Sequence, residues 1–198
     1  RRLVLVENRV AEARAHYFVQ LAAQQHAARE AGWDCRVYLA RGSDPAIVEA
    51  LGARCVHDDP PLWLLTRPAA GASAADAHLW RRSQSVALWD AVRADGIAAR
   101  DIVMLSTART GMLAGLDALF RPLAPADWPM VMARIHNHHA GETTADADYA
   151  AMLIRQSAQE IAAAPWCARV ALLATTDRLA RSLERLCWRR VVAPPMPL

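Results

Sequence analysis

The most polar loop of the sequence is His136-Asn137-His138-His139, which follows the apolar segment 130–135. Histidine changes its charge near neutral pH, so it can act as a general base or donate a hydrogen bond in a transition state. We therefore take His136 as the candidate catalytic residue and Asn137 as a substrate-binding residue. An exposed polar loop is the competing interpretation. A metal site is not predicted, because no acidic or cysteine partner lies at a recognised ligand spacing.

A second polar loop follows the apolar run 2–6 and contains Glu7, Asn8 and Arg9. His16 stands near the start of the next expected helix, where the helix dipole would lower its pKa and leave a neutral imidazole. Asn8, Arg9 and His16 therefore suit a network of hydrogen bonds to substrate hydroxyls. The alternative for His16 is a histidine at the surface or at the helix entry.

A third candidate segment, 106–111, places two hydroxyls and a guanidinium where a helix is expected to start. Ser106 or Thr107 is either the helix N-cap or a ligand contact. In the functional interpretation, backbone N–H groups and Arg109 hold an anion or a sugar hydroxyl. Arg134 ends the apolar segment before the histidine-rich loop, at a position that also suits substrate binding.

Several familiar active-site motifs are missing. No G-x-G-x-x-G follows segment 2–6, which argues against a classical NAD or FAD site. All 23 basic residues are arginine, so the chain has neither a Walker-A lysine nor a Schiff-base lysine. G-x-S-x-G and H-E-x-x-H are also missing. No cofactor is expected.

The elements that must position these loops alternate between short β-branched runs and longer helical stretches rich in alanine and leucine. Strands are expected at 2–6, 34–39, 54–56, 101–105, 130–135, 169–173 and 190–193, and helices at 16–31, 45–51, 78–95, 110–120, 147–164 and 176–187. This alternation predicts an α/β fold, a Rossmann-like doubly wound, mostly parallel sheet of six or seven strands flanked by helices. Ligands bind such sheets beyond the carboxyl ends of the strands, where the strand order reverses.

Local signals mark several helix boundaries. Asp44 before Pro45 is typical of a helix N-terminus, and Thr176 is expected to cap the helix 176–187. Gly32 and Gly52 stand where helices should stop. From Pro60 to about Ala77 the composition predicts an irregular excursion.

Composition excludes several classes of protein. The 198 residues are 54% hydrophobic with a net charge of +3, and the arginines alternate with acidic residues, so nucleic-acid binding is not indicated. No apolar run approaches the roughly 18 residues of a membrane span, so a cytoplasmic protein is expected.

The four cysteines lie far apart, as in thiols of a reducing compartment. A disulfide is a minor alternative, mainly between Cys35 and Cys55.

Six segments, taken in order along the sequence, resemble the N-terminal domain of GT-B glycosyltransferases of the family-4-like group. These segments are RLVLVEN, HYFVQLAAQQHAAREAGWDCRVYLA, DIVMLSTARTGM, MVMARIHNHH, VALLATTDRLARSLERL and VVAPPMPL. The resemblance covers nearly the whole chain. It implies that residues 1–193 form an acceptor-side domain and that 194–198 begin the linker to a C-terminal, donor-binding domain. It also places His136 in the cleft. The glycine-rich turn that the family commonly has after the first strand is missing.

The resemblance implies a transferase that moves a sugar from a nucleotide-sugar donor to an acceptor hydroxyl. His136, Asn8 and His16 would lie near the reacting centre, while Arg109 or Arg134 would balance the charge of phosphate or acceptor. The isolated domain is expected to be inactive. Its partners would be the acceptor and the donor-binding domain. One alternative is a non-catalytic Rossmann-like ligand-binding or regulatory domain. Another is a small hydrolase or nucleotide-sugar-modifying enzyme that uses the loop 136–139 with a metal. Arginines of the helix 176–187 offer a peripheral membrane contact, although a solvated surface is the favoured interpretation.

Overall fold

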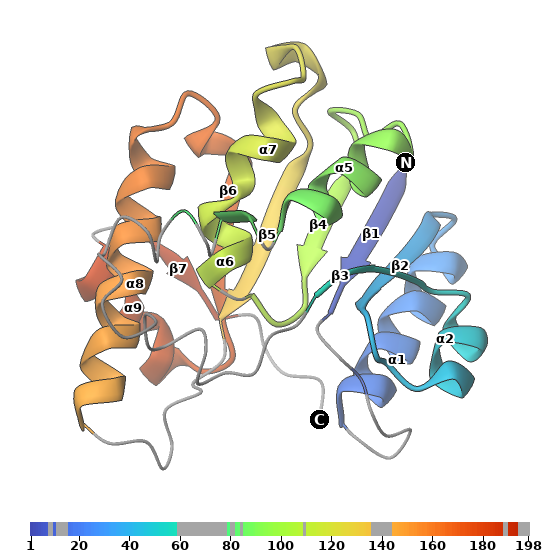
Figure 1. The fold of residues 1–198 in the computed structure, drawn as a ribbon, viewed down its shortest axis with the longest axis horizontal. Coiled ribbons are helices and arrows are strands. Elements are labelled where there is room, and N and C mark those ends of the chain that lie inside the picture. Colours follow the sequence, from blue (N-terminus) through green and yellow to red (C-terminus); the bar gives the residue numbers. More distant parts are fainter. Residues whose placement is uncertain are drawn as a thin grey trace.

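Seven parallel strands form one sheet in the computed structural model of the chain (Figure 1). The structure describes residues 1–7, 10, 16–58, 79, 82–83, 85–108, 110–135, 144–187 and 190–193. The strands are β1 (Arg2–Val6), β2 (Asp34–Ala40), β3 (Arg54–His57), β4 (Ile102–Leu105), β5 (Met130–Ile135), β6 (Val170–Ala174) and β7 (Val191–Val192). Their order is β3-β2-β1-β4-β5-β6-β7, and every neighbouring pair is parallel. The expected α/β, Rossmann-like fold is confirmed.

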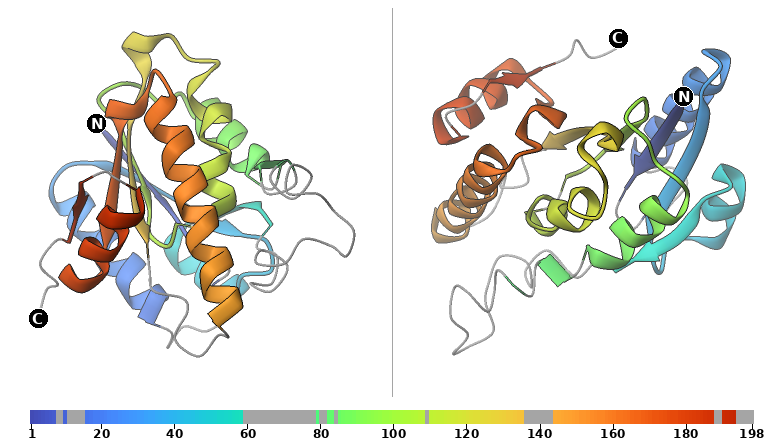
Figure 2. Two further views of the ribbon diagram at one scale, coloured as in Figure 1. Left: turned by 90° about the vertical axis from the view of Figure 1, so that its left-hand side faces the viewer. Right: turned by 90° about the horizontal axis from the view of Figure 1, so that it is seen from above.

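Helices connect the strands and flank the sheet. They are α1 (His16–Glu30), α2 (Pro45–Leu51), α5 (Val86–Ala94), α6 (Thr110–Ala114), α7 (Leu116–Phe120), α8 (Thr144–Ala163) and α9 (Asp177–Cys187), with short 3₁₀ turns η1 (Pro125–Asp127) and η2 (Cys167–Arg169). Figure 2 shows α5 to α8 on one side of the sheet and α1 on the other. The chain therefore reverses its direction along the sheet between β1 and β4, which makes this pair the topological switch point.

Two apolar cores lie on the two faces of the sheet. The larger packs Val4, Val103, Val131 and Leu172 against α5 to α9 and includes the stacked rings of Phe120 and Trp166, with centroids 4.7 Å apart. The smaller packs Leu5, Val37 and Leu39 against α1 and α2. Because side chains alternate between faces along a strand, each core takes every second residue of the central strands.

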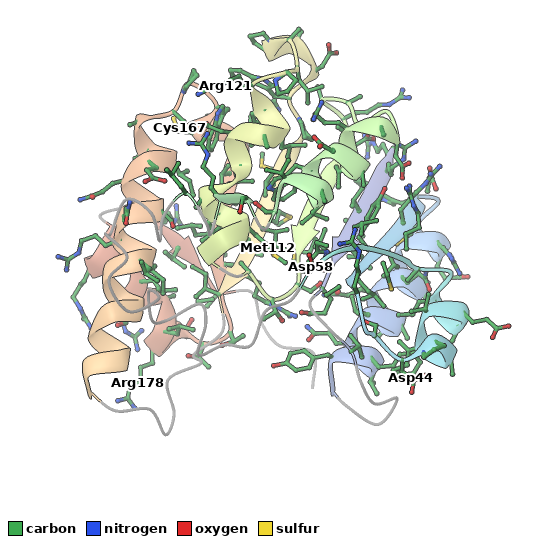
Figure 3. The ribbon with its side chains drawn as sticks, viewed as in Figure 1. Asp44, Asp58, Met112, Arg121, Cys167 and Arg178 are labelled. Carbon is green, nitrogen blue, oxygen red and sulfur yellow. The ribbon has the colours of Figure 1, made fainter. Side chains whose placement is uncertain are left out.

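The helix ends follow the local signals of the sequence. The Asp44 carboxylate accepts a hydrogen bond of 2.8 Å from Ala46 N, and Gly52 ends α2 with φ of 57°. Gly32, with φ of 75°, follows α1. Thr176 Oγ1 accepts from Leu179 N at 3.1 Å, so the expected cap of α9 is confirmed. Figure 3 shows Asp44 at the start of α2 and Arg178 on the first turn of α9.

Two expected helices differ from the structure. The helix expected at 110–120 is divided into α6 and α7 at Gly115. Gly115 also lies at a close approach, since a Cβ on it would lie 1.8 Å from Ser85 Oγ. The helix expected at 78–95 is continuous only from Val86 among the described residues. No helix of the described chain is both long enough and apolar enough to cross a membrane.

Candidate functional site at the switch point

The carboxyl ends of β1, β4 and β5 bring together a carboxylate, a hydroxyl and a guanidinium. Glu7 follows β1 directly, Thr107 lies two residues after β4, and Arg134 is the fifth residue of β5. Parallel strands all end at the same edge of a sheet, so residues far apart in sequence meet here. In Figure 1 this is the lower edge, towards which the strand arrows point.

Glu7 and Thr107 are joined by a buried hydrogen bond. Thr107 Oγ1 donates to Glu7 Oε2 at 2.9 Å, and the two residues are only 3% and 2% exposed. The backbone fixes Glu7 as well, since its N–H donates to the carbonyl of Tyr38 in β2 at 3.0 Å. A carboxylate removed from water costs free energy unless donors or a counter-charge compensate it. Its burial therefore marks an organised polar site.

Arg134 supplies the positive charge. Its Nε donates to the carbonyl of Ser106 at 2.8 Å, and the residue is only 8% exposed. Burial lowers the pKa of this guanidinium, while the negative charge of Glu7 and the phenol oxygen of Tyr17 act in the opposite direction. The buried Nη2 has no hydrogen-bond partner among the described residues. Buried donors are normally paired, so this nitrogen suits an oxygen of a bound molecule.

The backbone around the cluster is also tied together at this edge. Ser106 N donates to Val6 O at 2.9 Å, and Ala108 N donates to Arg134 O at 2.8 Å. The hydroxyl of Ser106 donates to Gln24 Oε1 of α1 at 3.4 Å. These contacts hold the three polar side chains on rigid elements, which is the arrangement that precise binding requires.

The cluster can bind an uncharged, hydroxylated molecule. A carboxylate accepts several hydrogen bonds, whereas a guanidinium only donates them. A substrate hydroxyl could donate to Glu7 and accept from Arg134. Among the described side chains, the charges of Glu7 and Arg134 oppose each other. None of the described glycines with positive φ, which are Gly32, Gly42, Gly52 and Gly96, lies at the ends of β1 or β4.

The structure brings together two of the residues expected from sequence, Thr107 and Arg134. His16 begins α1 as expected, but its side chain lies outside the description. The remaining candidates lie outside the described residues, and their roles stay predictions: Asn8, Arg9, Arg109, His136 and Asn137. Glu7 and Gln24 were not among the expected site residues. A carboxylate directly after a continuous apolar strand is the signal that could have identified Glu7.

The described residues bear on the expectations for metal ligands and cysteines. Within the described ranges, no group of three or more histidine, cysteine, aspartate or glutamate side chains could hold a metal ion. Cys35, Cys55 and Cys167 are free thiols. Cys55 is paired in register with Leu39 rather than with Cys35, although the two cysteines occupy neighbouring strands.

Comparison with known proteins gives no family. No family model matches the sequence, and no curated protein matches it. Among solved structures, the chain is similar to diaminopropionate ammonia lyase of Escherichia coli in its apo form, with 13% sequence identity and a TM-score of 0.24. The similarity covers 95% of this chain and 68% of the lyase chain. We infer neither fold nor function from it.

Proposed function

We propose that this chain is the N-terminal, acceptor-binding half of a two-domain GT-B glycosyltransferase, which transfers a sugar from a nucleotide-sugar donor to an acceptor hydroxyl. The observation that carries the proposal is the buried Glu7–Thr107 pair beside Arg134 at the switch point. Doubly wound sheets bind their ligands at this place. A fixed carboxylate with a neighbouring guanidinium has the donors and acceptors that recognise sugar hydroxyls.

The donor would bind to the second domain. A pyrophosphate needs close approach of the backbone, usually at glycines that open a helix after the first strand. Residues 7–15 contain no glycine. Binding of the acceptor alone is therefore the function assigned to this half, and the isolated chain should transfer no sugar.

The catalytic role in this proposal belongs to His136, the residue directly after β5. Arg134 precedes it by two residues in the sequence. His136 would act on the acceptor hydroxyl as base or hydrogen-bond donor, with Asn8, Asn137 and His16 around it. Arg109 would balance the charge of phosphate or acceptor, and Arg134 would donate a hydrogen bond to the acceptor hydroxyl. In an enzyme containing both domains, His136→Ala should lower turnover by at least about a hundredfold.

Two measurements on the isolated chain test the proposal. Saturation-transfer NMR with a panel of mono- and disaccharides should detect an acceptor, and Arg134→Met should weaken it. Titration with nucleotide sugars should give no binding and no released nucleotide. Sugar transfer by the isolated chain would contradict the division of labour between two domains.

A non-catalytic ligand-binding domain is the second candidate. The observation that favours it is the polar cluster itself, which is formed within the described chain without any second domain. The gene sequence beyond Leu198 separates the two candidates. A further α/β domain of similar length with a pair of glutamates supports the transferase, whereas a stop codon supports the binding domain.

A further inference from the structure

One face of the sheet is uneven in its burial from β4 to β7. On the side of α5 to α9, Val103, Val131, Leu172 and Val191 are buried. Their neighbours on the opposite side are less covered: Ile102, Met104, Met130, Met132 and Ala171 are partly exposed, and Val192 is 48% exposed. Among the described helices, α1 and α2 lie on this side and pack on β1 and β2 and on each other.

A groove of about 540 Å³ lies on this less covered face. Alanines of α1 and the ring of Trp33 line it together with apolar side chains of β1, β4, β5, β6 and β7, and Gln24 is the one polar residue among them. Binding sites for small molecules commonly have volumes of about 300 to 1,000 Å³ and mostly apolar walls. The groove is therefore large enough for an aliphatic chain.

The strands carry the groove towards the polar cluster. Leu5, Met104 and Met132 line the groove, and the residue two positions after each of them is Glu7, Ser106 and Arg134. Side chains two positions apart share a face of a strand. Leu173, also in the lining, is the register partner of Arg134.

Gln24 connects the two regions. It lines the groove and accepts a hydrogen bond from the Ser106 hydroxyl, while the Ser106 carbonyl accepts from Arg134. A molecule lying along the groove would therefore meet polar groups at the carboxyl ends of the strands. Among the described side chains, the charge of Glu7 opposes that of Arg134, which favours an uncharged, hydroxylated head group over an anion.

We infer that the groove and the polar cluster together bind one single-chain amphiphile, with its aliphatic chain along the sheet and its hydroxylated head group at Glu7 and Arg134. The inference rests on the proposed function in one respect, since the head-group hydroxyl would be the acceptor hydroxyl. The inferred acceptor is therefore an amphiphile with hydroxyl groups, such as a glycolipid or a long-chain polyol. Binding is measured without sugar transfer, so the two proposals can fail separately.

The first test uses alkyl β-glucosides below their micelle-forming concentration, titrated into the whole chain by calorimetry. Each added CH₂ from hexyl to nonyl should strengthen binding about twofold to fourfold. Glucose alone should bind at least about tenfold more weakly than octyl glucoside. Octyl sulfate should also bind at least about tenfold more weakly than octyl glucoside, because the negative charge of Glu7 opposes the attraction between Arg134 and the sulfate. Affinity independent of chain length, or equal for the sulfate, overturns the inference.

A matched pair of variants locates the site. Ala27 and Ala23 are both exposed on α1, but only Ala27 lines the groove. Ala27→Trp should fill the groove and weaken octyl glucoside at least about tenfold, whereas Ala23→Trp should leave its affinity within about twofold. Both substitutions are at exposed helix positions, so the fold should survive them. Equal effects of the two variants overturn the inference.

Methionine methyl groups report the same contact directly. In ¹³C-methyl NMR, octyl glucoside should shift Met104 and Met132, which line the groove, and leave Met112 in the opposite core unshifted. Plain phosphatidylcholine vesicles and sedimentation test the other occupants. Vesicle binding or self-association that Ala27→Trp abolishes, without a glucoside shift, would assign the groove to a membrane or a second copy and overturn the inference.

Discussion

The hydroxyl of Thr107 donates a hydrogen bond of 2.9 Å to the carboxylate of Glu7, a residue 100 positions earlier in the chain. Both residues are buried, and they lie at the ends of the two strands that flank the switch point. The contact thus joins the two halves of the sheet at the edge where ligands of this fold class bind. Removing either the donor hydroxyl of Thr107 or the acceptor carboxylate of Glu7 should therefore change both the stability of the protein and its ligand binding.

Thr107→Val removes the hydroxyl while keeping the shape of the side chain. Glu7 loses a donor in a buried place, so the free energy of unfolding should fall by about 1 to 3 kcal/mol. Urea denaturation measures this change. Thr175→Val, at a partly exposed position after β6, is the control and should change stability by less than about 0.5 kcal/mol. Equal effects would mean that the Glu7 contact contributes nothing measurable.

Arg134 and Glu7 should be energetically coupled. Arg134→Met leaves a buried carboxylate without its nearby positive charge, and Glu7→Gln leaves the guanidinium without its negative one. The double substitution removes both charges and should cost less than the sum of the single ones, with a coupling of about 1 to 3 kcal/mol. A double-mutant cycle from urea denaturation measures this coupling. Additive effects would contradict charge compensation at the site.

Gly115→Ala should destabilise the protein by about 1 to 3 kcal/mol, because the new methyl group would overlap Ser85 Oγ at 1.8 Å. Thermal unfolding measures the loss. Adding Ser85→Ala removes the nearest atom but leaves Ser85 Cβ at 3.1 Å, so the double variant should recover part of the stability. A Gly115→Ala protein as stable as the parent would show that α5 and the junction of α6 and α7 do not approach as described.

Asp95 should make stability depend on pH in the acid range. Burial acts to raise the pKa of its carboxyl, but hydrogen bonds from Tyr38 and Arg54 and the charges of Arg54 and Arg36 outweigh it, so the pKa lies below its ordinary value of 3.8. A carboxyl with a depressed pKa stabilises the fold above its ordinary pKa and loses that effect as the pH falls through the folded value.

Asp95→Asn should therefore lower stability by about 1 to 2 kcal/mol at pH 7, and the difference from the parent should shrink below about pH 4. Urea denaturation at a series of pH values measures the difference. Asp90→Asn is the control, since Asp90 is 54% exposed and pairs with Arg93 at the surface. A constant difference for Asp95→Asn across the acid range would contradict the depressed pKa.

Local chemistry made most of the elements predictable. The cap at Asp44, the left-handed Gly52 and the cap at Thr176 depend on side chains within a few residues of each other, so the sequence displays them directly. The break at Gly115 could not be predicted in this way. The residue that approaches Gly115 there is Ser85, which lies 30 positions earlier, at the start of α5.

The sequence by itself determined the parallel α/β fold and the strand ends where a site should be sought, because burial patterns and helix caps are local properties. That reasoning also named Thr107 and Arg134, whose roles in binding stay predictions. The tertiary structure decided that Glu7 receives the Thr107 hydroxyl, that Arg134 lies near them, and that a groove lies along one face of the sheet. These relations depend on strand order and register. Strand order and register bring together residues whose spacing in the sequence does not reveal that they are in contact.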